Sequence, residues 1–168
     1  MSRQIYNQRP LTPDDWDEVA EIYLEGIETR QATFETKVPG WDQWDMGHHQ
    51  FARLVLTDDN ELKGWAALSR VSAREVYAGV GEVSVYVRST SRGKGFGRVL
   101  LEALIEEAER NGIWTLQASI FRKNEVSLQL HSKSGFRTVG YRERIAKLDG
   151  TWHDTVLLER RSSIVGLV

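Results

Sequence analysis

Hydrophobic and polar positions along the chain repeat with two periods, which together predict a mixed α/β fold with more strands than helices. From Trp16 to Ile27, apolar residues recur at spacings of three, four and seven, which is typical of a helix with one buried face. The segment 12–15 before it holds a threonine, a proline and two acids, which favour a helix start. Gly26 predicts fraying at the end of this helix.

A period of two residues marks the predicted strands. Residues 3–9 predict a short strand, and apolar runs over 52–57 and 62–69 predict a hairpin around a polar turn. Over 83–88 three valines alternate with polar side chains, which is the pattern of a strand with two different faces.

Helical spacing, capping residues and glycines predict the remaining elements. A short helix is expected between Trp41 and Phe51, where two adjacent histidines interrupt the period. Further along, the pattern predicts a helix that includes Leu101 to Ala108 and stops at Gly112, a strand over 114–120, a helix from Asn124 to about Ser134, and strands near 136–146 and 152–159.

Length and composition limit the classes of protein that this chain can be. Its 168 residues predict a single domain, 1–168 with a core over about 3–161, because domains commonly hold roughly 100–200 residues. A formal net charge of −2 supplies no overall positive field for nucleic acid. The absence of cysteine excludes disulfides, thiolate metal sites and a cysteine nucleophile. Without a signal-peptide core or a run of about 20 apolar residues, the sequence predicts a cytoplasmic protein that does not enter a membrane.

A glycine-rich loop between a predicted strand and a predicted helix is the main chemical signal. Its glycines leave backbone N–H groups unobstructed, and the following helix adds the positive end of its dipole. The window 88–98 contains four basic residues and no acid, so it is locally cationic. The glycines are Gly93, Gly95 and Gly97, and the basic residues are Arg88, Arg92, Lys94 and Arg98. This loop predicts a phosphate site, with a solvated flexible turn as the alternative.

Two common phosphate motifs do not fit this loop. A P-loop requires four residues between its first glycine and a Gly-Lys-Ser/Thr string, which the chain lacks. The dinucleotide fingerprint requires Gly-x-Gly-x-x-Gly after a first strand, whereas this loop reads Gly-x-Gly-x-Gly in mid-chain. Nucleoside triphosphate, nicotinamide and flavin sites are therefore disfavoured.

The spacing Arg-x-x-Gly-x-Gly, from Arg92 to Gly97, resembles the pyrophosphate loop for coenzyme A in the GNAT acetyltransferases. The resemblance extends across essentially the whole chain and is strongest to the phosphinothricin and methionine sulfoximine N-acetyltransferase subgroup. The matching segments are Ala32-Thr33-Phe34-Glu35, Ala73-Arg74 with Tyr77, Glu82 to Val87, Ser127 to His131, Gly135-Phe136 and Gly150 to Asp154.

This resemblance implies a GNAT-type fold, in which helices flank a splayed, mostly antiparallel central β-sheet. It also implies acetyl-CoA as co-substrate, no metal, and a strand that pairs its backbone with the pantetheine arm. The cofactor contacts that it implies are Val85, Tyr86, Val87, Arg92, Gly93, Lys94, Gly95, Phe96, Gly97, Arg98, Asn124, Ser127 and His131.

Acetylation of an amine requires a base, because the amine of a free amino acid is mostly protonated at neutral pH and cannot attack. Glu82 lies at the start of the predicted strand, shares a face with Ser84 and Tyr86, and matches the base of the family. We expect Glu82 to deprotonate an amine that attacks the thioester directly. The alternative is an ordinary exposed strand glutamate.

His131 stands where many members of the family have a tyrosine that assists the leaving thiolate. Histidine titrates near neutrality, so His131 can be a general acid. It can equally be only a cofactor contact or a half-buried helix residue, and the sequence leaves these alternatives open.

Three residues match the acceptor pocket of the subgroup, namely Phe34, Arg74 and Tyr77. An arginine can bind a carboxylate or phosphinate through two parallel hydrogen bonds, which predicts a small anionic amino acid as acceptor.

The other histidines are weaker candidates for a catalytic or metal-binding role. The segment 152–154 is interpreted as a strand with a core tryptophan and an exposed His153. A metal site at His48 and His49 is disfavoured, because adjacent side chains on a helix point about 100° apart.

Together these features predict an N-acetyltransferase that transfers the acetyl group of acetyl-CoA to a phosphinothricin, methionine sulfoximine or methionine sulfone type of amine. One alternative is an acetyltransferase for a peptide N-terminus, a lysine or another amine. Another is a non-catalytic acyl-CoA-binding sensor. The subgroup resemblance also implies a homodimer, a role in antibiotic or herbicide resistance, and no nucleic-acid partner.

Overall fold

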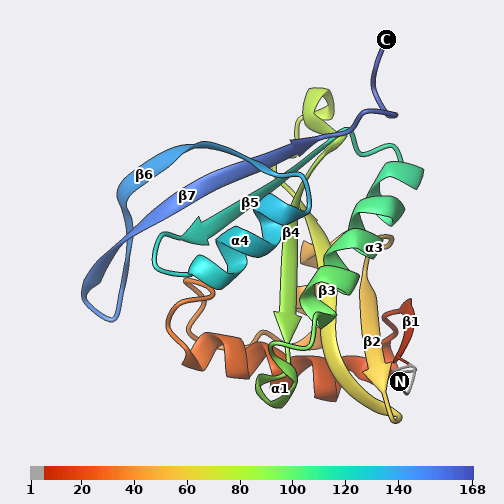
Figure 1. The fold of residues 1–168 in the computed structure, drawn as a ribbon, viewed down its shortest axis with the longest axis vertical. Coiled ribbons are helices and arrows are strands. Elements are labelled where there is room, and N and C mark those ends of the chain that lie inside the picture. The colour runs from red at the N-terminus through yellow and green to blue at the C-terminus, as the bar shows by residue number, and fades with distance from the viewer. Residues whose placement is uncertain (1–5) are drawn as a thin grey trace.

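The computed structural model describes residues 6–168 and contains a seven-stranded sheet flanked by helices (Figure 1). The strands are β1 (Tyr6–Pro10), β2 (Leu54–Asp58), β3 (Glu61–Arg70), β4 (Val80–Val87), β5 (Thr115–Phe121), β6 (Arg137–Leu148) and β7 (Thr151–Arg161). The α-helices are α1 (Trp16–Glu28), α2 (Trp41–Gly47), α3 (Phe96–Arg110) and α4 (Glu125–Lys133). The predicted mixed α/β class is confirmed; the part of the first predicted strand at residues 3–5 lies outside the described residues.

The sheet has the strand order β1-β2-β3-β4-β5-β7-β6 and is antiparallel except between β4 and β5. These two strands run parallel and pair only where Val80–Glu82 face Thr115–Gln117. Beyond Glu82 and Gln117 they diverge, so the sheet opens in the middle (Figure 1). The predicted splayed and mostly antiparallel sheet is therefore confirmed.

Side-chain alternation gives the sheet two apolar faces, each covered by helices. On one face Val55, Trp65 and Ala67 pack with Val19 and Ile22 of α1. On the other face the alternate residues of the same strands pack against α3. Glu82 and Tyr86 point to the α1 side, because Val83, Val85 and Val87 contact the α3 core.

Gly26 lies in the last turn of α1, so the helix ends near this glycine as expected, and the fraying stays a prediction. The helix continues to Glu28, and Gly26 is buried against the ring of Tyr86 on β4. A Cβ at this position would lie 2.6 Å from two ring carbons, which is too close for any contact between carbons. Glycine is required there because a strand side chain reaches the helix backbone, which local sequence does not reveal.

The β6–β7 hairpin extends away from the rest of the molecule (Figure 1). Along its length large apolar side chains remain exposed, among them Val139, Tyr141, Ile145 and Trp152. The expectation of a core tryptophan at Trp152 is therefore wrong: its side chain is 55% exposed and the ammonium of Lys147 lies over its ring. The strand alternation there directs the neighbouring His153 inward instead.

Candidate functional site

The glycine-rich loop lies directly before α3, as predicted. Gly93 and Gly95 have φ angles of +77° and +84°, in the left-handed region that favours glycine, and no atom lies within 4 Å of a Cβ built on either. Gly95 is the N-cap of α3, so the first N–H groups of that helix face the loop. Such an open loop before a helix N-terminus can accept a phosphate.

Basic side chains of this loop are divided between two roles. Arg92 and Lys94 are exposed, and Arg98 pairs with Glu102 one turn along α3 at 2.6 Å. Arg88 does not join them: its guanidinium is surrounded by acidic side chains, and its Nε donates to the Leu62 carbonyl oxygen at 3.0 Å. The acids around Arg88 are Glu18, Glu21, Glu25 and Glu61. The prediction that Arg88 adds to the cationic phosphate window is therefore wrong.

Phe96 is buried in the core on the α3 side, with an edge-to-face contact to Tyr6. Its side chain is thus unavailable, and any cofactor contact at this position would come from its backbone. At Gly97, a Cβ would lie 3.4 Å from Leu130 of α4 and 3.6 Å from Val87 of β4. The absence of a side chain at Gly97 lets these three elements converge.

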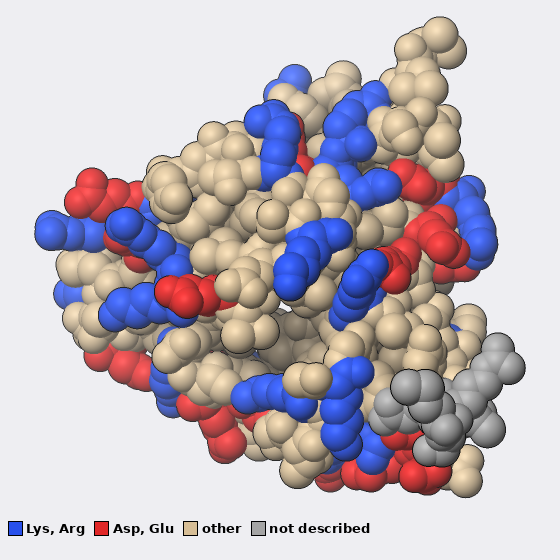
Figure 2. Space-filling model, viewed as in Figure 1, with Lys and Arg blue, Asp and Glu red and all other residues tan. Residues whose placement is uncertain are grey.

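An open cleft follows from the divergence of β4 and β5. Within residues 6–168, no strand pairs with the β5-facing edge of β4 from Val83 to Val87. The space-filling view shows a hollow here, between α4 and the loop before α3, with Lys and Arg side chains on its rim (Figure 2). Five residues of strand span about 16 Å, so the cleft connects the loop to Glu82 by an extended path.

Glu82 is half-buried at the point where the two strands separate. The side-chain amide of Gln117 on β5 donates a hydrogen bond from Nε2 to Oε2 of Glu82, over 2.8 Å. Sequence reasoning missed Gln117, although a polar residue between Leu116 and Ala118 in an apolar strand is a signal that could have been noticed.

The side chain of Tyr86 packs between other aromatic rings. Its ring stacks on Trp65 at 4.8 Å between centroids and contacts Tyr23 of α1 at 5.0 Å. Burial raises the pKa of its phenol, so it stays protonated at neutral pH. Only the backbone of Tyr86 is left for the predicted cofactor contact, as for its neighbours Val85 and Val87, which pack on the α3 side.

The predicted contacts on α4 form one hydrogen-bonded group. The side chain of Asn124 accepts from the Ser127 N–H at 3.2 Å and caps the helix, and its amide donates to the Gln31 carbonyl oxygen at 3.2 Å. His131 is buried, and its Nδ1 lies 2.7 Å from the Ser127 carbonyl oxygen. Because a carbonyl can only accept, Nδ1 carries a proton, and burial lowers the pKa of the imidazole. His131 is therefore neutral at pH 7, with its lone pair on Nε2.

An aromatic cluster lies at the far end of β5, on the same face as Gln117. Phe34, in the segment between α1 and α2, packs on Phe121 at 4.4 Å between centroids, and His153 stacks on Phe121 at 4.9 Å. The expectation of an exposed His153 is thus wrong, and sequence reasoning missed Phe121. Phe121 lies four positions after Gln117, which places the cluster about 13 Å along the strand from Glu82 and its partner.

Arg74 and Tyr77 belong to the connection between β3 and β4, which ends just before Glu82. Both are exposed, and the guanidinium carbon of Arg74 lies 5.5 Å from the centre of the Tyr77 ring. Phe34 and Arg74 therefore lie on separate segments of the chain.

His48 and His49 pack against aromatic side chains. His48 stacks on Trp44, and its Nδ1 lies 2.6 Å from the Trp44 carbonyl oxygen, while His49 is buried beside Phe51. Across residues 6–168 no three His, Asp or Glu side chains are grouped so that they could hold a metal ion.

None of the helices in the described part has the length and apolar character that a bilayer crossing needs.

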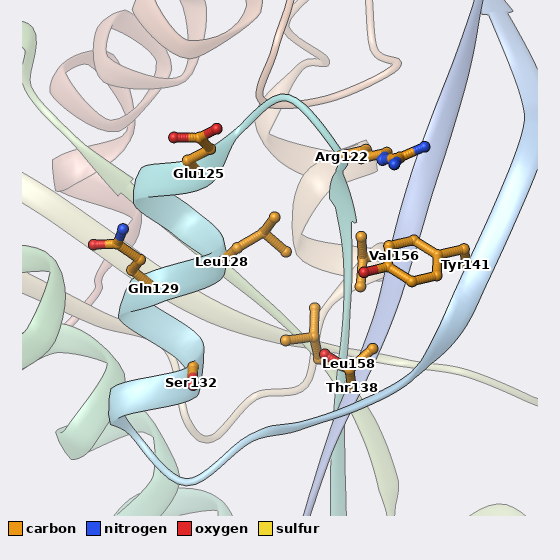
Figure 3. Close-up of a pocket in the computed structure, with 9 residues that line it drawn as sticks. All are labelled: Arg122, Glu125, Leu128, Gln129, Ser132, Thr138, Tyr141, Val156 and Leu158. Carbon is orange, nitrogen blue, oxygen red and sulfur yellow. The ribbon is translucent and has the colours of Figure 1, made fainter.

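A groove of about 390 Å³ lies on the other side of α4, against the β6–β7 hairpin (Figure 3). Leu128, Val156 and Leu158 form its apolar wall, and Arg122 packs over the ring of Tyr141 at its rim. The groove includes none of the predicted catalytic or cofactor residues. The predicted catalytic and cofactor residues therefore lie outside this groove.

Comparison with known proteins places these features in a wider context. Residues 9–157 match the family described as the acetyltransferase (GNAT) domain. YwnH of Bacillus subtilis, named as a candidate phosphinothricin acetyltransferase, is 34% identical over 154 residues, covering 89% of this chain and 94% of its own. The L-methionine sulfoximine/L-methionine sulfone acetyltransferase of Pseudomonas aeruginosa is 33% identical over 134 residues, covering 79% and 73%.

A solved structure shows the same architecture. The phosphinothricin acetyltransferase of Sinorhizobium meliloti, in complex with AcCoA, superposes with a TM-score of 0.87 at 25% identity, covering 97% of this chain and 91% of that one. The similarity therefore includes the splayed sheet as well as the loop.

Proposed function

Because this chain belongs to the GNAT acetyltransferase family, we propose that it acetylates the primary amine of a small, anionic, amino-acid-like acceptor, with Glu82 as general base. As a member of the family it is an acetyl-CoA-dependent N-acetyltransferase. The observation that carries the proposal is the position of Glu82, half-buried where β4 and β5 separate and in line with the open glycine loop.

Three features of the cleft support binding of acetyl-CoA. They are the unobstructed Gly93 and Gly95, the exposed Arg92 and Lys94, and the unpaired edge of β4. The loop and the start of α3 would hold the pyrophosphate, and the backbone from Val83 to Val87 would hold the pantetheine arm. When bound, acetyl-CoA supplies an activated acetyl thioester.

The role of Glu82 is to take one proton from the ammonium of the acceptor, which frees the nitrogen lone pair for attack on the acetyl carbon. A C–N bond forms, the C–S bond breaks, and coenzyme A leaves with the bonding electrons and then takes up a proton. In the overall reaction, an ammonium and an acetyl thioester are converted to an amide and a thiol, and one proton is released.

His131 is suited to accepting a hydrogen bond rather than to donating a proton. Its Nδ1 proton is engaged by the Ser127 carbonyl oxygen, and burial disfavours the protonated ring. We therefore assign His131 to orienting the cofactor through Nε2, and we assign no general acid to the departing thiolate.

The anionic part of the acceptor would be bound by Arg74, whose guanidinium has no carboxylate within salt-bridge distance among the described residues. Phe34 with Phe121 would contact its side chain from the other end of the cleft. A peptide amine or an aminoglycoside would bring a positive charge or a bulky chain to the same arginine, which disfavours those acceptors.

We further propose a homodimer, formed through the exposed apolar residues of the β6–β7 hairpin. The resemblance to the phosphinothricin acetyltransferase subgroup supports this assembly.

A thiol-release assay with a panel of acceptors tests the function. Phosphinothricin, methionine sulfoximine and methionine sulfone are expected to give turnover, whereas an alanine-initiated peptide and an aminoglycoside are expected to give little. Preference for the peptide or the aminoglycoside would contradict the acceptor class. Binding of acetyl-CoA with no turnover on any acceptor would favour a sensor.

Glu82→Gln tests the base in the same assay. Without a carboxylate to take the proton, turnover at pH 7 should fall by about 10²–10⁴-fold. The affinity for acetyl-CoA, measured by calorimetry, should change little because the glycine loop is intact. Full turnover of Glu82→Gln would remove Glu82 from the mechanism.

A further inference from the structure

Gln117 and Glu82 form a hydrogen-bonded pair at the last paired position of β4 and β5. The two residues face each other in the parallel register, and their side chains are joined over 2.8 Å. Since the strands separate immediately afterwards, the pair lies at the closed end of the cleft. Both side chains are half-buried, so the hydrogen bond is only partly exposed to water.

Chemistry fixes the orientation of both groups. A carboxylate can only accept, so the Gln117 amide must present Nε2 to Oε2 of Glu82 and direct its own oxygen elsewhere. Oε1 of Glu82 has no hydrogen-bond partner among the described residues. One carboxylate oxygen is therefore held, and the other remains available to an amine.

We propose that Gln117 is a positioning residue for the reaction, which holds one oxygen of Glu82 in place and directs its second oxygen into the cleft. This inference rests on the proposed function, because it assumes that Glu82 is the base. The hydrogen bond from the Gln117 amide restricts the flexible Glu82 side chain to one orientation, so that less ordering is needed when the acceptor binds.

Other ionisable groups on this face do not substitute for Gln117. Tyr86 on the same strand is buried against Trp65, and Glu159 of β7, which pairs with Gln117 across the sheet, is engaged by Arg137. Tyr23, Glu35 and His153 also lie on the α1 side, and Arg74 and Tyr77 lie in the connection before β4. None of them is hydrogen-bonded to Glu82 in the part of the chain described.

The test compares kcat and KM of the full-length wild type, Gln117→Leu, Gln117→Glu and Thr115→Val, with methionine sulfone as acceptor. In Gln117→Leu kcat should fall by about tenfold while KM changes little, because the base loses its fixed orientation. In Gln117→Glu the loss of kcat should be larger, because a carboxylate cannot donate to Oε2 of Glu82 and repels it. Thr115→Val removes a polar group two residues earlier on the same face and should leave kcat and KM unchanged.

Nuclear magnetic resonance gives a readout that is independent of turnover. In protein labelled with ¹³C in glutamate carboxyl groups, without acetyl-CoA, the Glu82 signal is identified by its loss in Glu82→Gln. Its chemical shift should change in Gln117→Leu and in Gln117→Glu, and it should stay at the wild-type value in Thr115→Val. If Gln117→Leu does not fold, Gln117→Glu, which has nearly the same volume, carries the test alone.

Failure of this inference and failure of the proposed function give different results. If Glu82→Gln is inactive but both Gln117 variants keep the wild-type kcat and the wild-type Glu82 signal, the positioning role is overturned and the base remains. If Glu82→Gln is fully active, the proposed base is overturned, and the positioning role with it. In the double variant Glu82→Gln/Gln117→Leu, no loss beyond that of Glu82→Gln alone supports action through Glu82.

Discussion

Gly95 illustrates how one backbone conformation can decide ligand binding. Its φ of +84° turns the chain so that the N–H groups of the loop and of α3 point to one place. Because no protein atom lies within 4 Å of a Cβ built there, a side chain would meet strain rather than crowding. An L-residue in this region costs about 1–2 kcal/mol.

We therefore predict that Gly95→Ala weakens acetyl-CoA binding by about tenfold, through backbone strain that reshapes the loop. Gly95→Asp should weaken it further, because a negative charge then faces the pyrophosphate. Calorimetry measures both. Gly47→Ala, at an equally open position without a positive φ, is the control; equal affinities in all four proteins would contradict a phosphate site at the loop.

His131 links one buried side chain to the pH dependence of stability. Burial lowers its pKa in the folded protein, so the unfolded chain binds a proton more readily. The contribution of His131 to the free energy of unfolding is therefore fully present above the ordinary histidine pKa of about 6.5. This contribution is lost as the pH falls below that value.

His131→Asn should reduce the dependence of the unfolding free energy on pH between about 7 and 5, by up to about 1.4 kcal/mol per pH unit. Asparagine can keep the donor to the Ser127 carbonyl oxygen but does not titrate. Urea unfolding at several pH values measures this. His48 and His49, whose pKa values burial also lowers, preserve part of the slope, and an unaltered slope would mean that His131 is protonated when folded.

At the scale of the element, the segment between α1 and α2 is tied to α4 on the far side of the cleft. Asn124 caps α4 with its oxygen and holds the Gln31 carbonyl with its amide, while Phe34 in the same segment packs on Phe121 of β5. One asparagine thus connects the helix beside the cofactor cleft to the segment that would contact the acceptor.

Two substitutions separate these roles of Asn124. Asn124→Ala should destabilise the protein by about 1 kcal/mol through loss of the cap and should raise the KM for the acceptor. Asn124→Asp keeps the cap acceptor but cannot donate to Gln31, so it should raise the KM with little loss of stability. Thermal unfolding and steady-state kinetics measure both effects. A weaker affinity for acetyl-CoA with an unchanged acceptor KM would instead favour the cofactor contact that the sequence predicts.

At the scale of the whole molecule, apolar surface is concentrated on the projecting hairpin. Tyr141 is 69% exposed and Ile145 is 49% exposed, on an edge strand whose outer hydrogen-bonding groups have no strand beside them in the described chain. Such an edge favours pairing with a second copy.

Light scattering after size exclusion should therefore give twice the chain mass of 19.2 kDa. Ile145→Glu, which introduces a charge into this surface, should shift the protein toward the single-chain mass. Met46→Glu is the control, because Met46 is exposed on α2, outside the hairpin. A dimer that resists Ile145→Glu and a further Tyr141→Glu change would assign the interface to another surface.

Most elements and the position of the glycine-rich loop could be predicted from the sequence, because both depend on neighbouring residues. The two-residue alternation of 83–88 and the stripe from Trp16 to Ile27 reflect the geometry of a single strand or helix. The turn at Asp59-Asn60, where both residues have positive φ, and the capping bond of Asn124 are equally local. Glu82 was selected because the strand pattern gives it the same face as Ser84 and Tyr86 and because it matches the base of the family, and its role as base stays a prediction.

Contacts between distant segments were decided by the tertiary structure alone. Gln117 is 35 residues from Glu82, and only the parallel pairing of β4 with β5 brings their side chains within hydrogen-bond distance. Arg88 is withdrawn from the loop by acids on α1, and Gly26 is needed because Tyr86 packs on its helix. The sequence by itself thus determined the elements, the glycine loop and the type of chemistry, since these follow from local backbone geometry and residue type. Only the tertiary structure decided which side chains share the cleft, because strand pairing and packing join residues that no local pattern relates.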